Sequence, residues 1–304
     1  MFSRRIAMAM LFAMLMSALT VAPAAAAKPS KPPPAQLEER PLTPEEQAQS
    51  DAKVAAANAY LASVAASGAD LVTLNCVTPT AAEPTAESTT PSTEASTDGA
   101  TIQACYVPQG FITVYARDQA YGHYCGPAVG QVIANYSWAV ASTVNKYSQG
   151  TIAGWMGTDA NGQTTAEWME AGLETATAGA PRRPANWNWV ITNVRDYNGN
   201  GGTGDEVFSY LRSNISGSKM PLAIPLKPHA SGALYWLASW PRAVASVGHW
   251  IAAYGWVGVY SGTSYSRLYF TDSSKDEGGS TGKFYNSVLS IAWMISRHTG
   301  RLVW

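Results

Sequence analysis

Histidine, cysteine and charge are all scarce in this sequence. Its 304 residues include four histidines and three cysteines, and charged residues make up only 13%, with a net charge of −1. The sequence has no basic stripe and no cluster of lysine or arginine, so we expect no nucleic-acid partner. The few cysteines and histidines lack the spacing of zinc ligands, so we expect neither a zinc site nor a cofactor.

Long apolar runs are also missing after the beginning of the chain. Residues 1–27 combine Arg4 and Arg5 with the apolar run IAMAMLFAMLMSALTVA and end in small residues that match an A-x-A cleavage site. This arrangement is typical of a secretory signal peptide, so we predict a secreted, extracellular protein whose mature chain begins near Lys28. An uncleaved membrane anchor is the alternative. No later segment is long and apolar enough to cross a bilayer.

An odd number of cysteines in an exported chain needs an explanation, because oxidising compartments favour paired cysteines. Residues 78–101 contain no Val, Ile, Leu, Met or aromatic residue, so burial cannot offset the entropy of ordering them. We predict a disordered, low-complexity loop there. Cys76 and Cys105 bracket this loop, and we predict a disulfide between them, with two free buried thiols as the alternative. Cys125 then remains unpaired.

Three further segments complete the predicted organisation. Residues 28–50 are rich in Pro, Glu and Gln, which is typical of an extended spacer. Residues 51–77 contain an Ala-rich helix and a connection, and residues 102–304 form the main domain. The helix is expected to dock through apolar residues at helical spacing, namely Val54, Ala57, Leu61 and Val64.

The main domain changes character near Ser218. After that point, short β-branched and aromatic runs alternate with Gly, Ser and Pro, which predicts mostly strands. Helices followed by an antiparallel sheet are typical of an α+β fold. Four helices are predicted before the sheet: one opening at Cys125, one near residues 148–158, and two after the capping-box patterns Thr164–Glu167 and Thr203–Glu206.

Cys125 lies in a position that favours reactivity. Gly126 and Pro127 follow it, and proline is tolerated in the first turn of a helix because its missing N–H would have no partner there. The unpaired N–H groups and the positive end of the helix dipole stabilise a thiolate, the reactive form of cysteine. We therefore predict a nucleophile, with a buried packing cysteine as the alternative.

A thiol peptidase also needs a base, and His249 is the best-placed histidine. A strand that begins at His249 turns near Gly262 and returns to Asp272, which brings Asp272 opposite about Ala252. A carboxylate there can bind one imidazole nitrogen and leave the other for the thiol. The alternative is that both residues merely cap strand ends. Strand alternation places His249, Ile251, Ala253 and Val257 on one face and Leu268, Phe270 and Asp272 on the facing row.

The other three histidines receive lesser roles. His123 is two residues from the nucleophile, and we expect it to line the cleft together with Gly126 and Trp250 as substrate-binding residues. His229 and His298 are expected to be structural or solvated.

One stretch matches half of a calcium-binding loop. Asp196, Asn198 and Asn200 place side-chain oxygens at alternate positions before Gly201, but Val207 occupies the position where a ligating glutamate is expected. A plain glycine-rich loop therefore remains the favoured interpretation, with calcium as a weak candidate.

The stretch from Gln119 through Cys125 to GPA, followed by SQGTIAGWMGT, GHWIAAYGW and FTDS, resembles the papain-like cysteine peptidases. Within them it is similar to bacterial bacteriocin-leader (double-glycine) processing peptidases and their secreted, free-standing relatives. The resemblance implies that Cys125 is the nucleophile, His249 the base, Asp272 the orienting residue and Gln119 the side-chain oxyanion donor. It also implies a helical lobe packed on an antiparallel sheet. The transporter and ATPase parts common in that group are missing, so cleavage after a double glycine is not implied.

Together these patterns predict a secreted cysteine peptidase that acts on a peptide or protein substrate. One alternative is a cell-wall peptide amidase or endopeptidase, with the N-terminal segment placing the domain near the envelope. Another is a non-catalytic module that binds a peptide or glycan, since all eleven tryptophans follow residue 137 and some could line a groove. A pure binding module has no need for all four of the predicted catalytic residues, which favours the enzyme.

Overall fold

The protein is described from a computed structural model of the whole chain. It describes residues 40–67, 108–158, 163–194, 202–228, 236–240, 248–258, 266–274 and 279–304, all of which belong to one compact unit that spans Pro34–Trp304. Several predicted features lie outside the described residues: the signal peptide, the spacer up to residue 39, the low-complexity loop, Cys76 and Cys105, the calcium candidates Asp196, Asn198 and Asn200, and His229.

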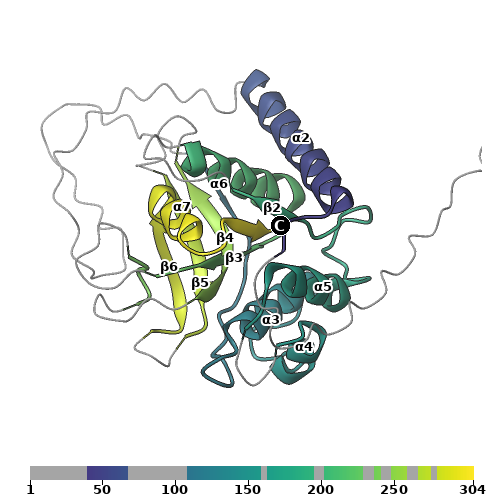
Figure 1. The fold of residues 1–304 in the computed structure, drawn as a ribbon, viewed down its shortest axis with the longest axis vertical. Coiled ribbons are helices and arrows are strands. Elements are labelled where there is room, and N and C mark those ends of the chain that lie inside the picture. Colours follow the sequence, from purple (N-terminus) through teal and green to yellow (C-terminus); the bar gives the residue numbers. More distant parts are fainter. Residues whose placement is uncertain are drawn as a thin grey trace, which may run out of the picture. The chain divides into compact units, whose positions relative to one another are not determined.

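The fold is α+β, as predicted. Within the described residues, six α-helices accompany an antiparallel sheet of seven strands with the order β2-β7-β3-β4-β5-β6, and β1 pairs with β4 (Figure 1). The elements are α2 (Pro44–Ala66), β1 (Gln109–Phe111), α3 (Cys125–Ser137), α4 (Gln149–Trp155), α5 (Ala166–Thr177), β2 (Ile191–Asn193), α6 (Gly202–Arg212), the π-helix η1 (Ser213–Ser218), β3 (Leu222–Leu226), β4 (His249–Val257), β5 (Arg267–Asp272), β6 (Gly282–Ser287), α7 (Val288–Ser296) and β7 (Arg301–Val303).

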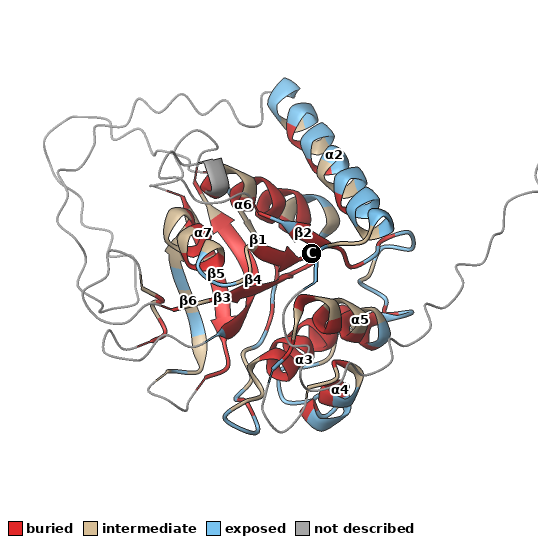
Figure 2. Cartoon of the chain, viewed as in Figure 1, coloured by how far each residue is buried: buried red, intermediate tan, exposed pale blue. Residues whose placement is uncertain are grey.

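Helix α3 is the centre of the helical part and is buried along nearly its whole length (Figure 2). It packs closely on α4 and α5 because two glycines leave room for one methionine. A Cβ at Gly130 would lie 2.4 Å from Met156 Cε, and a Cβ at Gly172 would lie 2.3 Å from Met156 Cγ. The sequence predicted one apolar face for this helix, but its position between α4, α5 and β4 buries every face.

The hairpin of β4 and β5 forms as predicted, but its register differs by one residue. A bulge lies between Ala253 and Gly255, and Ala252 is opposite Thr271 rather than Asp272. The bulge also moves Trp256, instead of the predicted Val257, into the buried part of the sheet, where its ring lies 5.7 Å from that of Phe208 in α6. Bulges of this kind add one residue to a strand and shift its alternation.

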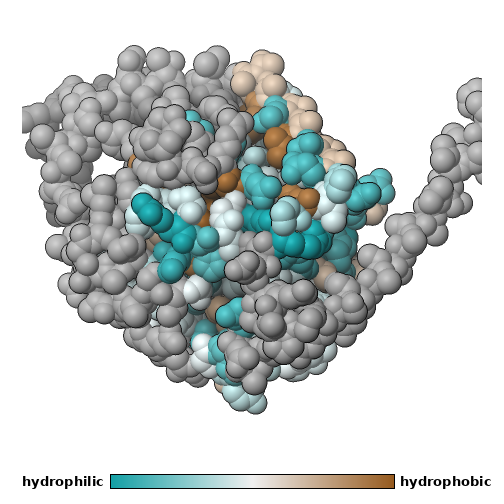
Figure 3. Space-filling model, in the orientation of Figure 1, coloured by the Kyte–Doolittle hydropathy of each residue, from teal (hydrophilic) through white to brown (hydrophobic). Residues whose placement is uncertain are grey.

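The N-terminal helix α2 begins at Pro44, so residues 44–50 are helical rather than part of the spacer as predicted. The backbone N–H of Glu46 donates to the Thr43 hydroxyl, and the Glu46 carboxylate accepts from the Thr43 N–H, which forms a capping box. Its exposed side is rich in alanine, and the corresponding region of Figure 3 shows pale brown residues beside hydrophilic ones.

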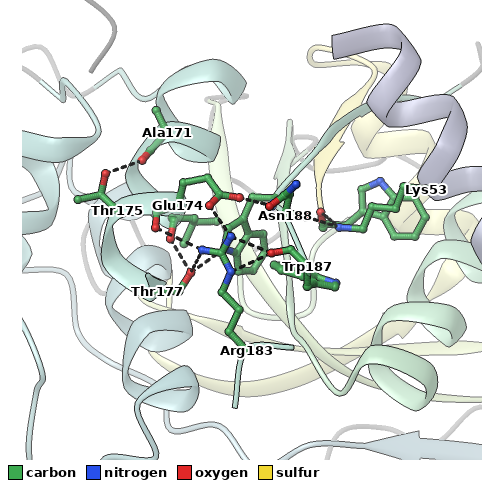
Figure 4. Close-up of polar contacts among 11 residues, drawn as sticks. Lys53, Ala171, Glu174, Thr175, Thr177, Arg183, Trp187 and Asn188 are labelled. Carbon is green, nitrogen blue, oxygen red and sulfur yellow. Dashed lines mark hydrogen bonds and ion pairs between the residues drawn. The ribbon is translucent and has the colours of Figure 1, made fainter. Parts of the chain in front are cut away.

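Helix α2 is fastened to the domain by polar bonds as well as by apolar residues. Ser50 Oγ lies 2.9 Å from Thr192 Oγ1 in β2, and Lys53 Nζ donates to the carbonyl oxygen of Asn188 at 2.8 Å (Figure 4). The same ammonium lies 3.9 Å from the ring centre of Trp187. Of the apolar residues predicted to dock the helix, Ala57 and Leu61 are buried, and Val54 packs against the core.

Four local predictions were wrong. The N-cap of α5 is Thr165 rather than Thr164, and α6 begins at Gly202, so Thr203 lies inside it. Two strands, β1 and β2, precede most of the sheet in the chain. Residues 288–296, predicted with the strands, form helix α7. No helix within the described ranges is long and apolar enough to span a membrane.

Candidate active site

Cys125 is the first residue of α3, as predicted. The N-cap residue, Tyr124, makes no side-chain hydrogen bond to the first turn, and Pro127 contributes no N–H. The backbone N–H groups of Cys125 and Gly126 therefore point out of the helix start without a side-chain cap. Cys125 is a free thiol and is partly exposed, so it can meet a substrate.

His249 and Asp272 meet at the same end of the β4–β5 hairpin, because one begins β4 and the other ends β5. His249 Nε2 lies 2.8 Å from Asp272 Oδ1. The exposed fractions of the two side chains are only 3% and 0%, so water does not weaken the bond. Since Nε2 is held by the carboxylate, Nδ1 is the nitrogen left for the thiol.

The protonation of this pair follows from its partners. Burial opposes a charged imidazole, but the charge and hydrogen bond of Asp272, together with the hydrogen bond and charge of Cys125, raise the pKa of His249 to about 10. Burial also opposes ionisation of Asp272, but the charge and hydrogen bond of His249, helped by Ser239 and the Ser274 N–H, lower the pKa of the carboxyl. The site therefore favours a charged imidazolium beside the Asp272 carboxylate.

Two residues that the sequence analysis missed hold the far oxygen of Asp272. The Ser239 hydroxyl donates to Asp272 Oδ2, and the Trp240 indole N–H donates to the same oxygen at 3.1 Å. The Trp240 ring also lies 4.9 Å from the His249 ring. Trp240 therefore both bonds the carboxylate and covers the imidazole.

The segment that carries Ser239 and Trp240 is itself bonded to the sheet. The Asn286 side chain in β6 accepts from the Ala238 N–H at 2.9 Å and donates to the Trp236 carbonyl oxygen at 2.9 Å. The Ser280 N–H donates to the Ser239 carbonyl oxygen at 3.0 Å. No motif or spacing pattern links this segment to Asp272, so the sequence carried no signal for it.

Gln119 is brought to the same end of the sheet. Its backbone N–H donates to the Ser273 carbonyl oxygen at 3.0 Å, next to Asp272 in the chain. Its side chain is buried, and Nε2 donates to the Gly122 carbonyl oxygen at 2.8 Å. This bond identifies the nitrogen end of the amide and uses one of its two N–H groups, which leaves the second for another acceptor.

A second glutamine, Gln149 in α4, fixes the backbone on both sides of Gln119. Gln149 Oε1 accepts from the Ala120 N–H at 2.7 Å, and its Nε2 donates to the Asp118 carbonyl oxygen at 2.7 Å. The backbone around Gln119 is therefore held by α4 as well as by the sheet. No sequence pattern singled out Gln149, although it lies in the stretch SQGTIAGWMGT.

The three predicted substrate-binding residues have different surroundings. His123 is partly exposed and belongs to a small aromatic group, since its ring lies 5.8 Å from Tyr121 and 4.8 Å from Tyr124. Gly126 and Trp250 are buried and meet at Thr164. A Cβ on Gly126 would lie 2.4 Å from Thr164 Oγ1, and the Trp250 indole donates to the Thr164 carbonyl oxygen at 2.9 Å.

These contacts join the start of α3 to the start of β4, so Gly126 and Trp250 help to set the distance between Cys125 and His249. A direct contact of either one with substrate remains a prediction. His298, predicted to be structural or solvated, is exposed, although a Cβ on Gly248 would lie 2.6 Å from its Nε2.

Within the part of the chain that the structure describes, no three His, Cys, Asp or Glu side chains are grouped to hold a metal ion. Comparison with known proteins adds no family: no family model matches the chain. No curated protein matches it either.

Proposed function

We propose that the protein is a secreted, papain-like cysteine peptidase that hydrolyses a peptide bond. The observation that carries this proposal is the buried His249, hydrogen-bonded to Asp272 at 2.8 Å, whose pKa is raised first by Asp272 and then by Cys125. Structural ion pairs also bury charge, but they gain nothing from a partly exposed thiol at an uncapped helix start. These features fit a nucleophile, a base and an orienting carboxylate.

In the first half of the reaction, the Cys125 thiolate attacks the carbonyl carbon of the scissile bond, and the carbonyl π electrons move to the oxygen. The resulting oxyanion accepts hydrogen bonds from the Cys125 N–H and from the free N–H of Gln119. The C–N bond then breaks as the His249 imidazolium gives its proton to the leaving amine. The products are the free amine and a thioester on Cys125.

In the second half, neutral His249 takes a proton from a water molecule as its oxygen attacks the thioester carbonyl. Collapse of the second tetrahedral intermediate releases the carboxylic acid and regenerates the thiolate and the imidazolium. Asp272 keeps the imidazole in one orientation through both halves and stabilises its charged form. The chemistry needs no metal ion and no cofactor.

A digest of a mixed peptide library with the full-length protein tests this proposal directly. We expect new amino termini within the peptides, and the control variant Cys125→Ser should produce none. Mass mapping after brief exposure to iodoacetamide should find the label on Cys125. Equal cleavage by the Cys125→Ser protein would exclude the thiol mechanism. A wild-type protein that neither cleaves the library nor labels at Cys125 would exclude the peptidase.

A further inference from the structure

A second surface of the sheet carries features that the proposed reaction does not use. Among the described residues, five large apolar side chains are clearly exposed: Phe111, Tyr115, Tyr121, Val144 and Tyr285. Three of these, Phe111 (46% exposed), Tyr115 (38%) and Tyr285 (50%), gather on one face of the sheet. Figure 2 shows exposed residues along β6 on this side. We call the group formed by Phe111, Tyr115, Tyr254, Tyr269 and Tyr285 the aromatic strip.

The strip follows one row across four strands. Phe111 in β1 is opposite Gly255 in β4, Gly255 is opposite Tyr269 in β5, and Tyr269 is opposite Tyr285 in β6. The ring centres of Phe111 and Tyr269 lie 4.9 Å apart, and those of Tyr269 and Tyr285 lie 5.4 Å apart. The Tyr254 ring joins the row 6.4 Å from Phe111.

Gly255 makes this row continuous. A Cβ at this position would lie only 2.2 Å from Phe111 Cδ1. Because Gly255 has no side chain, the Phe111 ring lies over β4 and reaches Tyr269 on the next strand. Any other residue there would push the ring away, so the sheet is shaped to keep the rings together.

Two cationic side chains, Lys283 and Arg267, flank the rings. Lys283 Nζ lies 5.2 Å from the centre of the Tyr254 ring and 5.9 Å from that of Tyr115. Arg267 precedes Tyr269 by two positions in β5 and therefore lies on the same face, where its charge acts on the Tyr269 hydroxyl. The surface combines flat rings, phenol hydroxyls and positive charge.

We propose that the aromatic strip binds a glycan strand that carries carboxylates. The exposed rings of Phe111 and Tyr285 can pack against the faces of sugars. The phenol hydroxyls and Lys283 can bond to sugar hydroxyls, and both cations complement carboxylates.

The position of the strip connects this site to the candidate active site. Tyr115 lies four positions before Gln119 in the chain, and Lys283 is paired with Thr271, next to Asp272. A glycan bound along the strip would therefore hold its attached peptides near Cys125. This part of the inference rests on the proposed peptidase function and assigns its substrate class, a peptide linked to an acidic glycan.

Cosedimentation with purified, insoluble peptidoglycan tests the inference. The binding protein is the full-length Cys125→Ser variant, which cannot consume the ligand. Phe111→Ala combined with Tyr285→Ala should weaken binding about tenfold or more, because both exposed rings are lost. Lys283→Glu should also weaken it and reduce its dependence on salt. Val144→Ala and Lys146→Glu, exposed changes in the helical part, are the matched controls and should bind like the parent.

Chitin, a neutral polymer of similar sugars, and soluble stem peptides free of glycan separate the sources of binding. We expect weaker binding to chitin and little to the peptides. Unchanged binding in the Phe111→Ala/Tyr285→Ala protein would overturn the inference. Equal loss of binding to the free peptides in that variant would overturn it in favour of a peptide surface.

Hydrolysis of a short soluble peptide, measured in proteins that retain Cys125, distinguishes this inference from the proposed function. Strip variants should keep that hydrolysis. If the parent binds glycan through the strip but hydrolyses no peptide, the glycan site stands and the peptidase fails.

Discussion

Ionisable side chains are buried in two regions of this molecule, and burial selects opposite charge states there. At the candidate active site, Asp272 and Cys125 overcome the cost of burial, and the pKa of His249 rises to about 10, which keeps the imidazole charged. Near the start of helix α2, burial raises the pKa of Glu170, and the negative charges of Glu46, Glu174 and Glu167 raise it further. Arg40 opposes this shift, but the pKa still reaches about 8, which keeps the Glu170 carboxyl neutral near pH 7.

The difference lies in the neighbours. His249 faces opposite charges within hydrogen-bond reach, so its charged form is stabilised. Glu170 lies among carboxylates that already have cationic partners of their own: Glu46 pairs with Arg40, Glu174 with Arg183 and Glu167 with Arg301. The first region keeps a charged imidazole, and the second keeps a neutral carboxyl near the start of α2.

Removal of His249 should have the largest effect on the candidate active site. His249→Ala should lower peptide hydrolysis by about 10⁴-fold or more, because neither the thiol nor the leaving amine then has a proton partner. Alkylation of Cys125 by iodoacetamide at mildly acidic pH should slow as well. The measurement is alkylation rate against pH for the variant and the wild type. Superimposable curves would rule out the thiolate–imidazolium pair.

The wild-type pH profile gives a related expectation. Because the folded pKa of His249 is raised to about 10, the proton needed by the leaving amine is present at neutral pH and is lost only as the pH rises through about 10. Turnover should therefore persist through mildly alkaline conditions. A decline centred near the ordinary imidazole value of about 6.5 would mean that Asp272 does not hold the charged form.

Gln119→Ala should have the next largest effect. Loss of one oxyanion donor typically lowers turnover by about 10²–10³, and the fold should remain intact. Steady-state kinetics should show the loss in kcat more than in KM. The exposed Gln163→Ala variant is the matched control and should behave like the wild type. Full turnover in the Gln119 variant would assign the oxyanion to other donors.

The bonds around Asp272 predict a smaller, coupled effect. Asp272→Ala should be folded and impaired, though less than Gln119→Ala, because water can partly replace the orienting bond. Ser239→Ala should lower turnover roughly tenfold, since it removes a hydrogen bond to a buried carboxylate. If Ser239 acts through Asp272, Ser239→Ala should cause no further loss in the Asp272→Ala background. Additive losses would indicate a separate role for Ser239.

The docking region predicts the smallest effect, on stability rather than turnover. The folded pKa of Glu170 is raised to about 8 from an ordinary value near 4.5, so the folded state keeps a proton that the unfolded state has lost. Stability should therefore decrease as the pH rises between these two values and then level off. Glu170→Gln should flatten that decrease in thermal melts. The exposed Glu45→Gln variant should retain it, and an identical slope in both variants would contradict the assignment.

Local patterns predicted much of this structure. The helix start at Cys125, the hairpin from His249 to Asp272 and the order of helices before strands all follow from spacing within short windows. Helix α7 was missed because VLSIAWMIS is a short, mostly apolar segment that contains residues favouring strands, and a short apolar run does not separate a buried helix from a strand.

The errors and omissions at the site have a different cause. The bulge between Ala253 and Gly255 shifts the observed register by one residue from the predicted one, and no local sequence pattern indicated the bulge. Ser239 and Trp240 bond to Asp272 from a separate segment, and Gln149 holds the backbone around Gln119 from α4. Such contacts depend on tertiary packing, which a sequence pattern does not encode. The proposed reaction partners lie in recognisable local motifs, whereas the residues that support them do not.

The joint between α3 and β4 at Thr164 also bears on how the chain folds. Cys125 and His249 are distant in sequence and meet only after the helical part docks on the sheet and the Trp250 indole reaches the Thr164 carbonyl oxygen. Contacts between distant residues form late in folding, because closing long loops costs entropy. A nascent or partly folded chain thus carries an ordinary thiol, and rapid alkylation of Cys125 during refolding should appear last, after helix formation. We therefore expect the Cys125 thiol to become reactive only when folding is complete.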